Sequence, residues 1–172
     1  MDKHGDEVKE LCTKGGKTLF WSSNFSLGVA IFSAVNKYLA KIMNNFPAYE
    51  VSMTETHHIH KLDAPSGTAI TLAEGILENM NRKSKWVKGT MVAPDGTVSG
   101  TSECAENEFP VNSIREGRCL VFILSAMTLR RTASQLPMMQ RIGRGLPWEL
   151  FWRRNYTSRH EGLLGMSDLF QF

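Results

Sequence analysis

The pattern of apolar and polar residues predicts two amphipathic helices. From Ser26 to Met43 the apolar side chains keep the 3.6-residue period of an α-helix, and Asn24 or Ser26 is the expected N-cap. A second helix is expected to open at residues 65–68, with Ser66 as its cap. Its buried face would be formed by small and aliphatic residues: Ala69, Ile70, Ala73, Ile76, Leu77 and Met80.

Strands are predicted between and around these helices. Residues 49–57 alternate between apolar and polar over part of their length, which is typical of a half-buried strand, and residues 111–115 favour another strand. Residues 81–110 are polar and predict turns, most clearly at the Pro-Asp-Gly of residues 94–96. Before the first long helix, residues 6–12 favour a short helix that ends at a glycine pair, and residues 17–22 favour a strand.

The composition is that of a globular protein. The chain has 172 residues, of which 42% are hydrophobic and 22% charged, so it is long and apolar enough to bury a core. Its three cysteines are far apart and odd in number, which argues against a disulfide framework and favours a reducing compartment. No apolar run approaches the roughly 20 residues that span a bilayer, and no secretory signal is recognisable. We therefore expect a cytoplasmic protein with no membrane partner.

The positive charge is concentrated in one segment. Residues 118–154 carry seven arginines, no lysine and a single acid, Glu149, whereas the rest of the chain has ten lysines and three arginines. The segment therefore has a net charge of +6 and the remainder −3, which together give the +3 of the whole chain. Such a segment can bind nucleic acid or a membrane, but its arginines do not follow one helical face. We expect no nucleic-acid partner and interpret the chain as two differently composed sequences joined together.

Residues 55–68 hold the densest cluster of reactive groups: three histidines, a lysine, two acids and a helix start. An imidazole titrates near neutral pH, so a histidine at a strand end can donate a proton while a nearby ammonium group holds an anion. The helix start offers a second anion site through the N–H groups of Gly67 and Thr68 and the hydroxyls of Ser66 and Thr68. The predicted ligand is a small dianion that bridges Lys61 and this helix start.

The same residues also allow other interpretations. A strand-end histidine, a capping serine and an aspartate before a turn are common structural features of folded proteins. His58 and His60 would lie on one face of an extended strand near Asp63, which would suit a metal ion. Lys61 would repel that cation, so we assign no metal ligand. Ser66 lacks the Gly-x-Ser-x-Gly surroundings of a serine hydrolase nucleophile.

Residues 55–69 read Glu-Thr-His-His-Ile-His-Lys-Leu-Asp-Ala-Pro-Ser-Gly-Thr-Ala. This sequence resembles the signature of the 4-hydroxy-tetrahydrodipicolinate reductases, also called dihydrodipicolinate reductases. Supporting matches are found at residues 22–29, 113–117 and 165–169. The resemblance extends from about residue 6 to residue 117 and resumes at about residue 156. It implies an α/β plus α+β fold class, in which a remnant of a Rossmann-type nucleotide-binding domain precedes an α+β substrate domain with an open mixed sheet.

The resemblance also implies a reaction and the roles of individual residues. In this family a nicotinamide cofactor, NADH or NADPH, gives hydride to a cyclic imine dicarboxylate in lysine and diaminopimelate biosynthesis, and the parent protein is a homotetramer built through the sheet. His57 matches the proton donor and Lys61 the second catalytic position. The implied substrate contacts are His58, Ser66, Gly67 and Thr68. The implied cofactor contacts are Ser22, Ser23, Asn24 and Phe25.

Two features depart from the family. No Gly-x-Gly-x-x-Gly fingerprint follows a strand in this sequence, so we expect an N-terminally truncated chain. The arginine-rich segment matches nothing in the family as written, but a shifted reading frame through its possible codons gives a family-like sequence. We therefore interpret residues 118–155 as out of frame. The substrate domain would then lack the sheet partners encoded there, and the chain is expected to be poorly folded and inactive.

These features predict four segments: residues 1–24 as the nucleotide-domain remnant, 25–117 as the substrate-binding and catalytic domain, 118–155 as the out-of-frame segment and 156–172 as a family-like tail. The favoured function is NAD(P)H-dependent reduction of a small dicarboxylate. One alternative is a small metal- or ligand-binding module that uses the histidines without redox chemistry. Another is a nucleic-acid-binding protein that uses the arginines.

Overall fold

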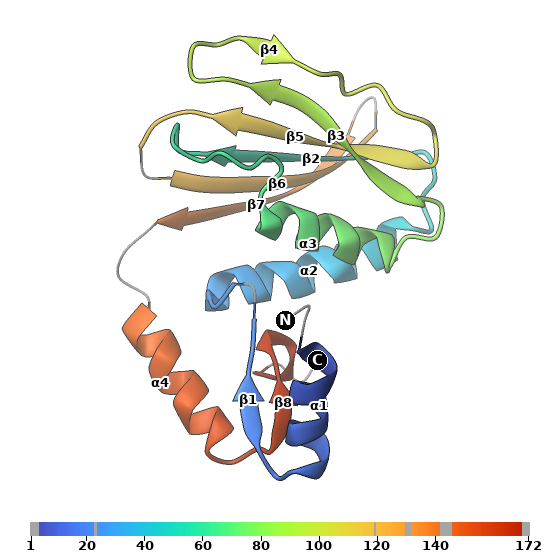
Figure 1. The fold of residues 1–172 in the computed structure, drawn as a ribbon. Coiled ribbons are helices and arrows are strands. Elements are labelled where there is room, and N and C mark those ends of the chain that lie inside the picture. The colour runs from blue at the N-terminus through green and yellow to red at the C-terminus, as the bar shows by residue number, and fades with distance from the viewer. Residues whose placement is uncertain (1–3, 23, 119, 130–131, 142–145, 170–172) are drawn as a thin grey trace. The chain divides into compact units, whose positions relative to one another are not determined.

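The computed structural model describes residues 4–22, 24–118, 120–129, 132–141 and 146–169. The chain divides into two compact units, one made of residues 1–30 and 143–172 and the other of residues 31–142. Figure 1 shows the helices and strands of each unit. The four segments expected from the sequence have other boundaries, and they remain a prediction.

The larger unit contains an open, mixed six-stranded sheet in the order β4-β3-β5-β2-β6-β7 (Figure 1). Its strands are β2 (Glu50–His57), β3 (Lys85–Val92), β4 (Val98–Ser99), β5 (Glu108–Arg115), β6 (Leu120–Leu129) and β7 (Thr132–Arg141). Strand β2 pairs in parallel with β5 and antiparallel with β6, so it has hydrogen-bonded neighbours on both sides. This sheet confirms the open mixed architecture that the sequence predicts.

Two helices lie on one side of this sheet (Figure 1), and both are predicted by the apolar periodicity. They are α2 (Leu27–Met43), most of which belongs to the larger unit, and α3 (Gly67–Leu77). Ser66 caps α3, as predicted, because its side-chain oxygen accepts a hydrogen bond from the first turn at 3.2 Å. The two helices are joined by the fully buried Asn36, which donates to the carbonyl of Leu72 at 3.0 Å.

Buried and less buried side chains alternate along β2 and along residues 111–115 of β5, as the two-residue period of a strand requires. In β2 the buried residues include Met53, Glu55 and His57, and in the parallel neighbour β5 they include Ser113 and Arg115. The register places Glu55 beside Ser113 and His57 beside Arg115. Two neighbouring strands therefore bring polar side chains to one buried face at their C-terminal ends.

The prediction that residues 81–110 are turn-rich is wrong for three stretches. Residues 85–92 form β3, residues 98–99 form β4, and residues 108–110 begin β5 earlier than expected. Strand β3 contains residues that favour strands, such as Trp86 and Val87, but two lysines and a glycine interrupt them and weaken the signal. The strand pairs with β5, with a register shift between Lys88 and Met91, and also with β4. The predicted Pro-Asp-Gly turn is confirmed, since Gly96 has a φ of 83° and donates to the carbonyl of Ala93 at 2.9 Å.

Gly89 lies in the irregular part of β3, close to Asn112 of β5. A Cβ at this position would collide with Oδ1 of Asn112, which accepts hydrogen bonds from Thr90 N–H at 2.9 Å and the Ser102 hydroxyl at 2.8 Å. We predict that Gly89→Ala lowers the free energy of unfolding by about 1–3 kcal/mol, because Asn112 must leave these donors. Urea unfolding measures the change. Gly28→Ala is the control that should not destabilise, since its Cβ would have only an ordinary 3.8 Å contact; equal losses in both variants would contradict the prediction.

The expected loss of sheet partners from residues 118–155 is wrong. Strand β6 pairs with β2, and β7 pairs with β6 along its length. Residues 120–124 are five consecutive large apolar residues, Leu-Val-Phe-Ile-Leu, without proline or glycine, and this composition favours a strand whatever its origin. The segment therefore supplies two strands to the sheet. The frameshift itself remains a prediction, because it concerns the source DNA.

The smaller unit contains α1 (Gly5–Lys14), β1 (Thr18–Phe20), α4 (Leu146–Thr157), β8 (Gly162–Leu164) and the 3₁₀ turn η1 (Met166–Leu169). Strands β1 and β8 form a two-stranded parallel sheet. Helix α1 and strand β1 confirm the short helix and strand predicted before the first long helix. That they are a remnant of a nucleotide-binding domain remains a prediction. No helix in the described part of the chain is long and apolar enough to cross a bilayer.

Candidate functional site

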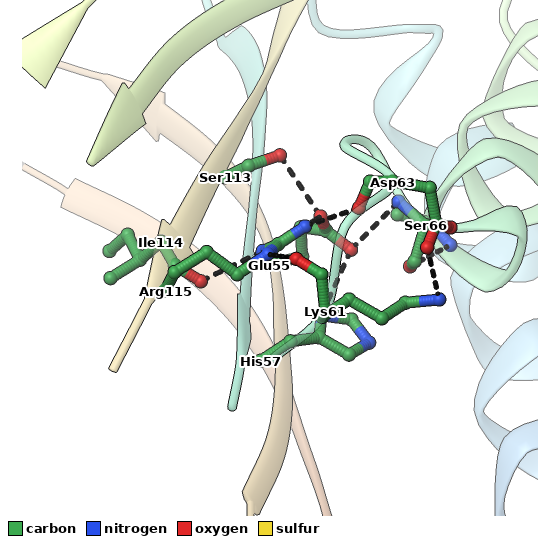
Figure 2. A network of polar contacts seen from close by, with 9 residues as sticks. Glu55, His57, Lys61, Asp63, Ser66, Ser113, Ile114 and Arg115 are labelled. Atoms are coloured by element: carbon green, nitrogen blue, oxygen red, sulfur yellow. Dashed lines mark hydrogen bonds and ion pairs between the residues drawn. The ribbon is translucent and has the colours of Figure 1, made fainter. Parts of the chain in front are cut away.

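The predicted cluster lies where β2 ends and the chain turns toward α3. His57 is the last residue of β2 and is only 5% exposed. Residues 58–66 form an irregular segment that carries Lys61 and ends at the Ser66 cap of α3. Figure 2 shows His57, Lys61 and Ser66 around the buried side chain of Glu55. The structure therefore brings three of the predicted site residues together.

Glu55 is the centre of this arrangement, and its side chain is fully buried. Its Oε1 accepts hydrogen bonds from the Ser113 hydroxyl at 3.0 Å and from Nη2 of Arg115 at 3.1 Å. Its Oε2 accepts a hydrogen bond from Ser66 N–H at 3.1 Å and lies 3.2 Å from Nδ1 of His57. The contact with His57 is close but is not a well-aligned hydrogen bond. One carboxylate thus contacts β5, the imidazole and the start of α3.

The charge of Glu55 follows from these contacts. Burial alone would raise the pKa of this carboxyl group, because the carboxylate loses its hydration. The contacts with His57 and the hydrogen bonds from Ser66 outweigh burial and lower the pKa from 4.5 to about 2. Glu55 is therefore ionised at neutral pH. A carboxylate beside Nδ1 orients the imidazole and leaves Nε2 as the nitrogen that can exchange a proton with a ligand.

Arg115 of β5 connects the irregular segment of residues 58–66 to the sheet by hydrogen bonds. It is 2% exposed and donates through Nε to the carbonyl of Lys61 at 3.0 Å and through Nη2 to the carbonyl of Asp63 at 2.6 Å. Nη1 donates to the carbonyl of Ile114 at 2.9 Å. Arg115 is therefore a buried cation whose partners are backbone carbonyls and the Glu55 carboxylate.

The ammonium group of Lys61 lies at the solvent side of the site. It is 2.6 Å from Oδ1 of Asp63, and the two side chains are 29% and 58% exposed. The hydrogen bond from Lys61 is the main cause that lowers the pKa of Asp63. Because an exposed ion pair gains little free energy in water, Lys61 can be shared with an anionic ligand at small cost.

The start of α3 has one accessible and one enclosed residue. Gly67 is exposed, and a Cβ there would meet no atom within 4 Å, so a ligand can approach its backbone. Thr68 follows it in the first turn and is half-buried. Ser66 is 3% exposed and uses both its N–H and its hydroxyl oxygen within the protein. Its role here is that of a cap, and its contact with a ligand remains a prediction.

The remaining histidines do not lie as the metal interpretation expects. Strand β2 ends at His57, so His58 and His60 lie in the irregular segment and not on one face of a strand. Their ring centres are 6.2 Å apart, and His58 is half-buried while His60 is exposed. Within the described ranges, no group of three His, Cys, Asp or Glu side chains is arranged to hold a metal ion.

The predicted cofactor contacts belong to the smaller unit, and Ser23 lies outside the described residues. The Ser22 hydroxyl donates to the Asn24 carbonyl at 2.7 Å and accepts from Asn24 N–H at 3.2 Å. The Phe25 ring faces the guanidinium group of Arg153, whose Cζ is 4.6 Å from the ring centre. These contacts order the loop, and its role toward a cofactor remains a prediction.

The sequence reasoning assigned no role to Glu55, Ser113 or Arg115. A usable signal is present, because Glu55 falls in phase with the apolar Val51 and Met53 of the same strand. A charged residue at a buried position of a strand needs a partner of opposite charge. Nothing in the local sequence identifies that partner as Arg115, which lies 60 residues further along the chain.

A family model described as the C-terminus of dihydrodipicolinate reductase matches residues 28–127, which extends past residue 117 into β6. The 4-hydroxy-tetrahydrodipicolinate reductase of Christiangramia forsetii is 38% identical over 110 residues, which are 64% of this chain and 41% of that protein. The protein of the same name from Clostridium botulinum is 35% identical over 114 residues, 65% of this chain and 41% of the relative. The chain thus spans about two fifths of the length of these relatives.

The fold has a counterpart among solved structures. The dipicolinate-bound dihydrodipicolinate reductase from Paenisporosarcina sp. TG-14 matches 99% of this chain and 61% of its own chain, with a TM-score of 0.71. The sequences are 19% identical, so this likeness shows the fold alone.

Proposed function

Because this chain belongs to the dihydrodipicolinate reductase family, we propose that residues 55–68 bind a small cyclic dicarboxylate and donate a proton to it. The observation that carries the proposal is the grouping of His57, Lys61 and the start of α3 around the buried Glu55 (Figure 2). In a whole reductase this would serve the NADH- or NADPH-dependent reduction of 4-hydroxy-tetrahydrodipicolinate, a step of lysine and diaminopimelate biosynthesis.

Two anion-binding groups support the choice of a dicarboxylate. The Lys61 ammonium is partly exposed and pairs with the exposed Asp63, so it can bind one carboxylate. The first turn of α3, at Gly67 and Thr68, can bind the second through backbone N–H groups and the positive end of the helix dipole. His58, which is half-buried in the irregular segment of residues 58–66, is the further substrate contact in this proposal.

His57 would supply the proton. Reduction of a cyclic imine leaves a ring nitrogen that must take up a proton, and an imidazole is a suitable donor near neutral pH. The Glu55 carboxylate faces Nδ1 at 3.2 Å, which directs Nε2 toward the ligand.

The residues described in the smaller unit do not fit a dinucleotide. A pyrophosphate needs a glycine-rich turn that follows a strand and opens a helix. Here the pair Gly15 and Gly16 follows α1 and precedes β1, which is the opposite order. In addition, Ser22 and Asn24 bond to each other. We therefore propose that this chain by itself does not turn over NADH or NADPH.

A homotetramer built through the sheet and a cytoplasmic location are further parts of the proposal. Helices α2 and α3 cover one side of β6 and β7. The other side carries Phe122 and Leu124, which are half-exposed, and Met139, which is 59% exposed. Apolar side chains in such a position favour contact between copies.

The out-of-frame origin of residues 118–155 also remains a proposal, supported by their arginine content. Codons in the source DNA that cannot encode the family-like sequence would end it.

Dipicolinate binding to the 172-residue chain tests the proposed site. We expect calorimetric titration to show binding, and Lys61→Met to weaken it by about tenfold or more, because a charge-assisted hydrogen bond is lost. Lys88→Met is the control, since Lys88 is an exposed lysine of β3. Absence of binding at millimolar dipicolinate, or equal affinities of the Lys61 and Lys88 variants, would contradict the proposal.

A further inference from the structure

We infer that Arg115 is a positioning residue for the proposed site, which fixes the backbone that carries Lys61 and, through Glu55, the His57 ring and the start of α3. The inference rests on the proposed function, and it gives a role to a cation that the proton transfer itself does not use. Because Arg115 is 2% exposed, it acts through these neighbours and not as a contact of the ligand.

The planar guanidinium group of Arg115 fixes the backbone of residues 61–63 through two hydrogen bonds. Its Nε donates to the Lys61 carbonyl at 3.0 Å, and its Nη2 donates to the Asp63 carbonyl at 2.6 Å. Residues 61–63 belong to no helix or strand, so no backbone ladder fixes them. The donors of a guanidinium group point in fixed directions, and two bonds from one group therefore set both the position and the orientation of this backbone.

Glu55 connects Arg115 to the other two parts of the site, the His57 ring and the start of α3. Its Oε1 accepts from Nη2 of Arg115 at 3.1 Å, and its Oε2 contacts Nδ1 of His57 at 3.2 Å and accepts from Ser66 N–H at 3.1 Å. A single carboxylate thus joins the cation to the proton donor and to the helix start. Displacement of Arg115 would move all three relative to one another.

Stability alone does not account for this arrangement. A buried ion pair is often no more stabilising than apolar residues of the same volume. Here the partners of the cation are carbonyls of the segment that carries Lys61, and its counter-ion contacts His57 (Figure 2). The buried pair therefore links the groups that must meet the ligand together.

Lys83 offers a matched control for a substitution at Arg115. It is also a buried cation, 3% exposed, and donates to two backbone carbonyls, those of Glu106 at 2.6 Å and Glu108 at 2.9 Å. It pairs with Glu50, the first residue of β2, whereas His57 is the last. Removal of this cation disturbs the same sheet at the end remote from the site.

The test compares Arg115→Met with Lys83→Met in the 172-residue chain. Both variants should lose stability, but only Arg115→Met should weaken dipicolinate binding, by about tenfold or more, because a misplaced group loses its contact with the ligand. Arg115→Lys keeps the charge without the planar fork and should recover only part of the affinity. Equal dipicolinate affinities of Arg115→Met and Lys83→Met would overturn the inference and leave the proposed function intact.

Amide hydrogen exchange separates this inference from the proposed function. If the unsubstituted chain binds no dipicolinate, the proposed function fails, and exchange at residues 58–64 decides the positioning role. Faster exchange there in Arg115→Met than in Lys83→Met supports the role, and equal exchange overturns it. If Arg115→Met does not fold, Arg115→Lys replaces it in both measurements, with Lys83→Arg as its control.

Discussion

Glu55→Ala is expected to lower the free energy of unfolding by about 3–5 kcal/mol, because it leaves a buried charge without its partner. Arg115 would remain enclosed at 2% exposure without the Glu55 carboxylate, its ion-pair partner. Ser66 N–H and the Ser113 hydroxyl would also lose their acceptor. Urea denaturation followed by circular dichroism measures the loss at neutral pH.

An exposed ion pair provides the control for this substitution. Glu78 lies 2.6 Å from Lys37, but the two side chains are 61% and 43% exposed. Glu78→Ala should therefore cost less than about 1 kcal/mol, since surface pairs contribute little. A loss as small as this in Glu55→Ala would contradict the burial and the pairing described for the Glu55 carboxylate.

The second large effect is expected in acid. Because the pKa of Glu55 is lowered from 4.5 to about 2 in the folded protein, the unfolded chain takes up this proton more readily. The resulting stabilisation is complete above about pH 4.5 and is lost as the pH falls through about 2. A pKa difference of this size corresponds to about 3 kcal/mol.

Glu55→Gln isolates this contribution. The variant should be less stable than the parent at neutral pH, and the difference between the two should shrink by about 3 kcal/mol between about pH 4.5 and pH 2. Urea unfolding at a series of pH values measures both proteins. The pKa of Asp63 is also lowered, but its side chain is 58% exposed, so it should contribute little to this difference. A constant difference across the range would contradict the assignment.

Local features of this protein could be predicted from the sequence because they depend on residues that are close together in the chain. The apolar periods of α2 and α3, the Ser66 cap and the Pro-Asp-Gly turn each involve only a few neighbouring residues. The histidine and lysine of residues 55–69, and their resemblance to a reductase signature, are local in the same sense. The open mixed sheet followed from that resemblance and not from the pattern alone.

Pairing across the sheet decided the remaining strands and the contacts of the site. Residues 85–92 form a strand that pairs with β5 on one side and β4 on the other, and residues 120–129 and 132–141 supply two further strands that the sequence does not predict. The Glu55–Arg115 pair joins residues 60 apart in the chain, and only the parallel register of β2 with β5 places them together. By itself, the sequence determined which reactive side chains the segment carries and which helices flank it. The tertiary structure decided which of them meet and what holds them there, because those contacts come from strand pairing and shared burial between distant residues.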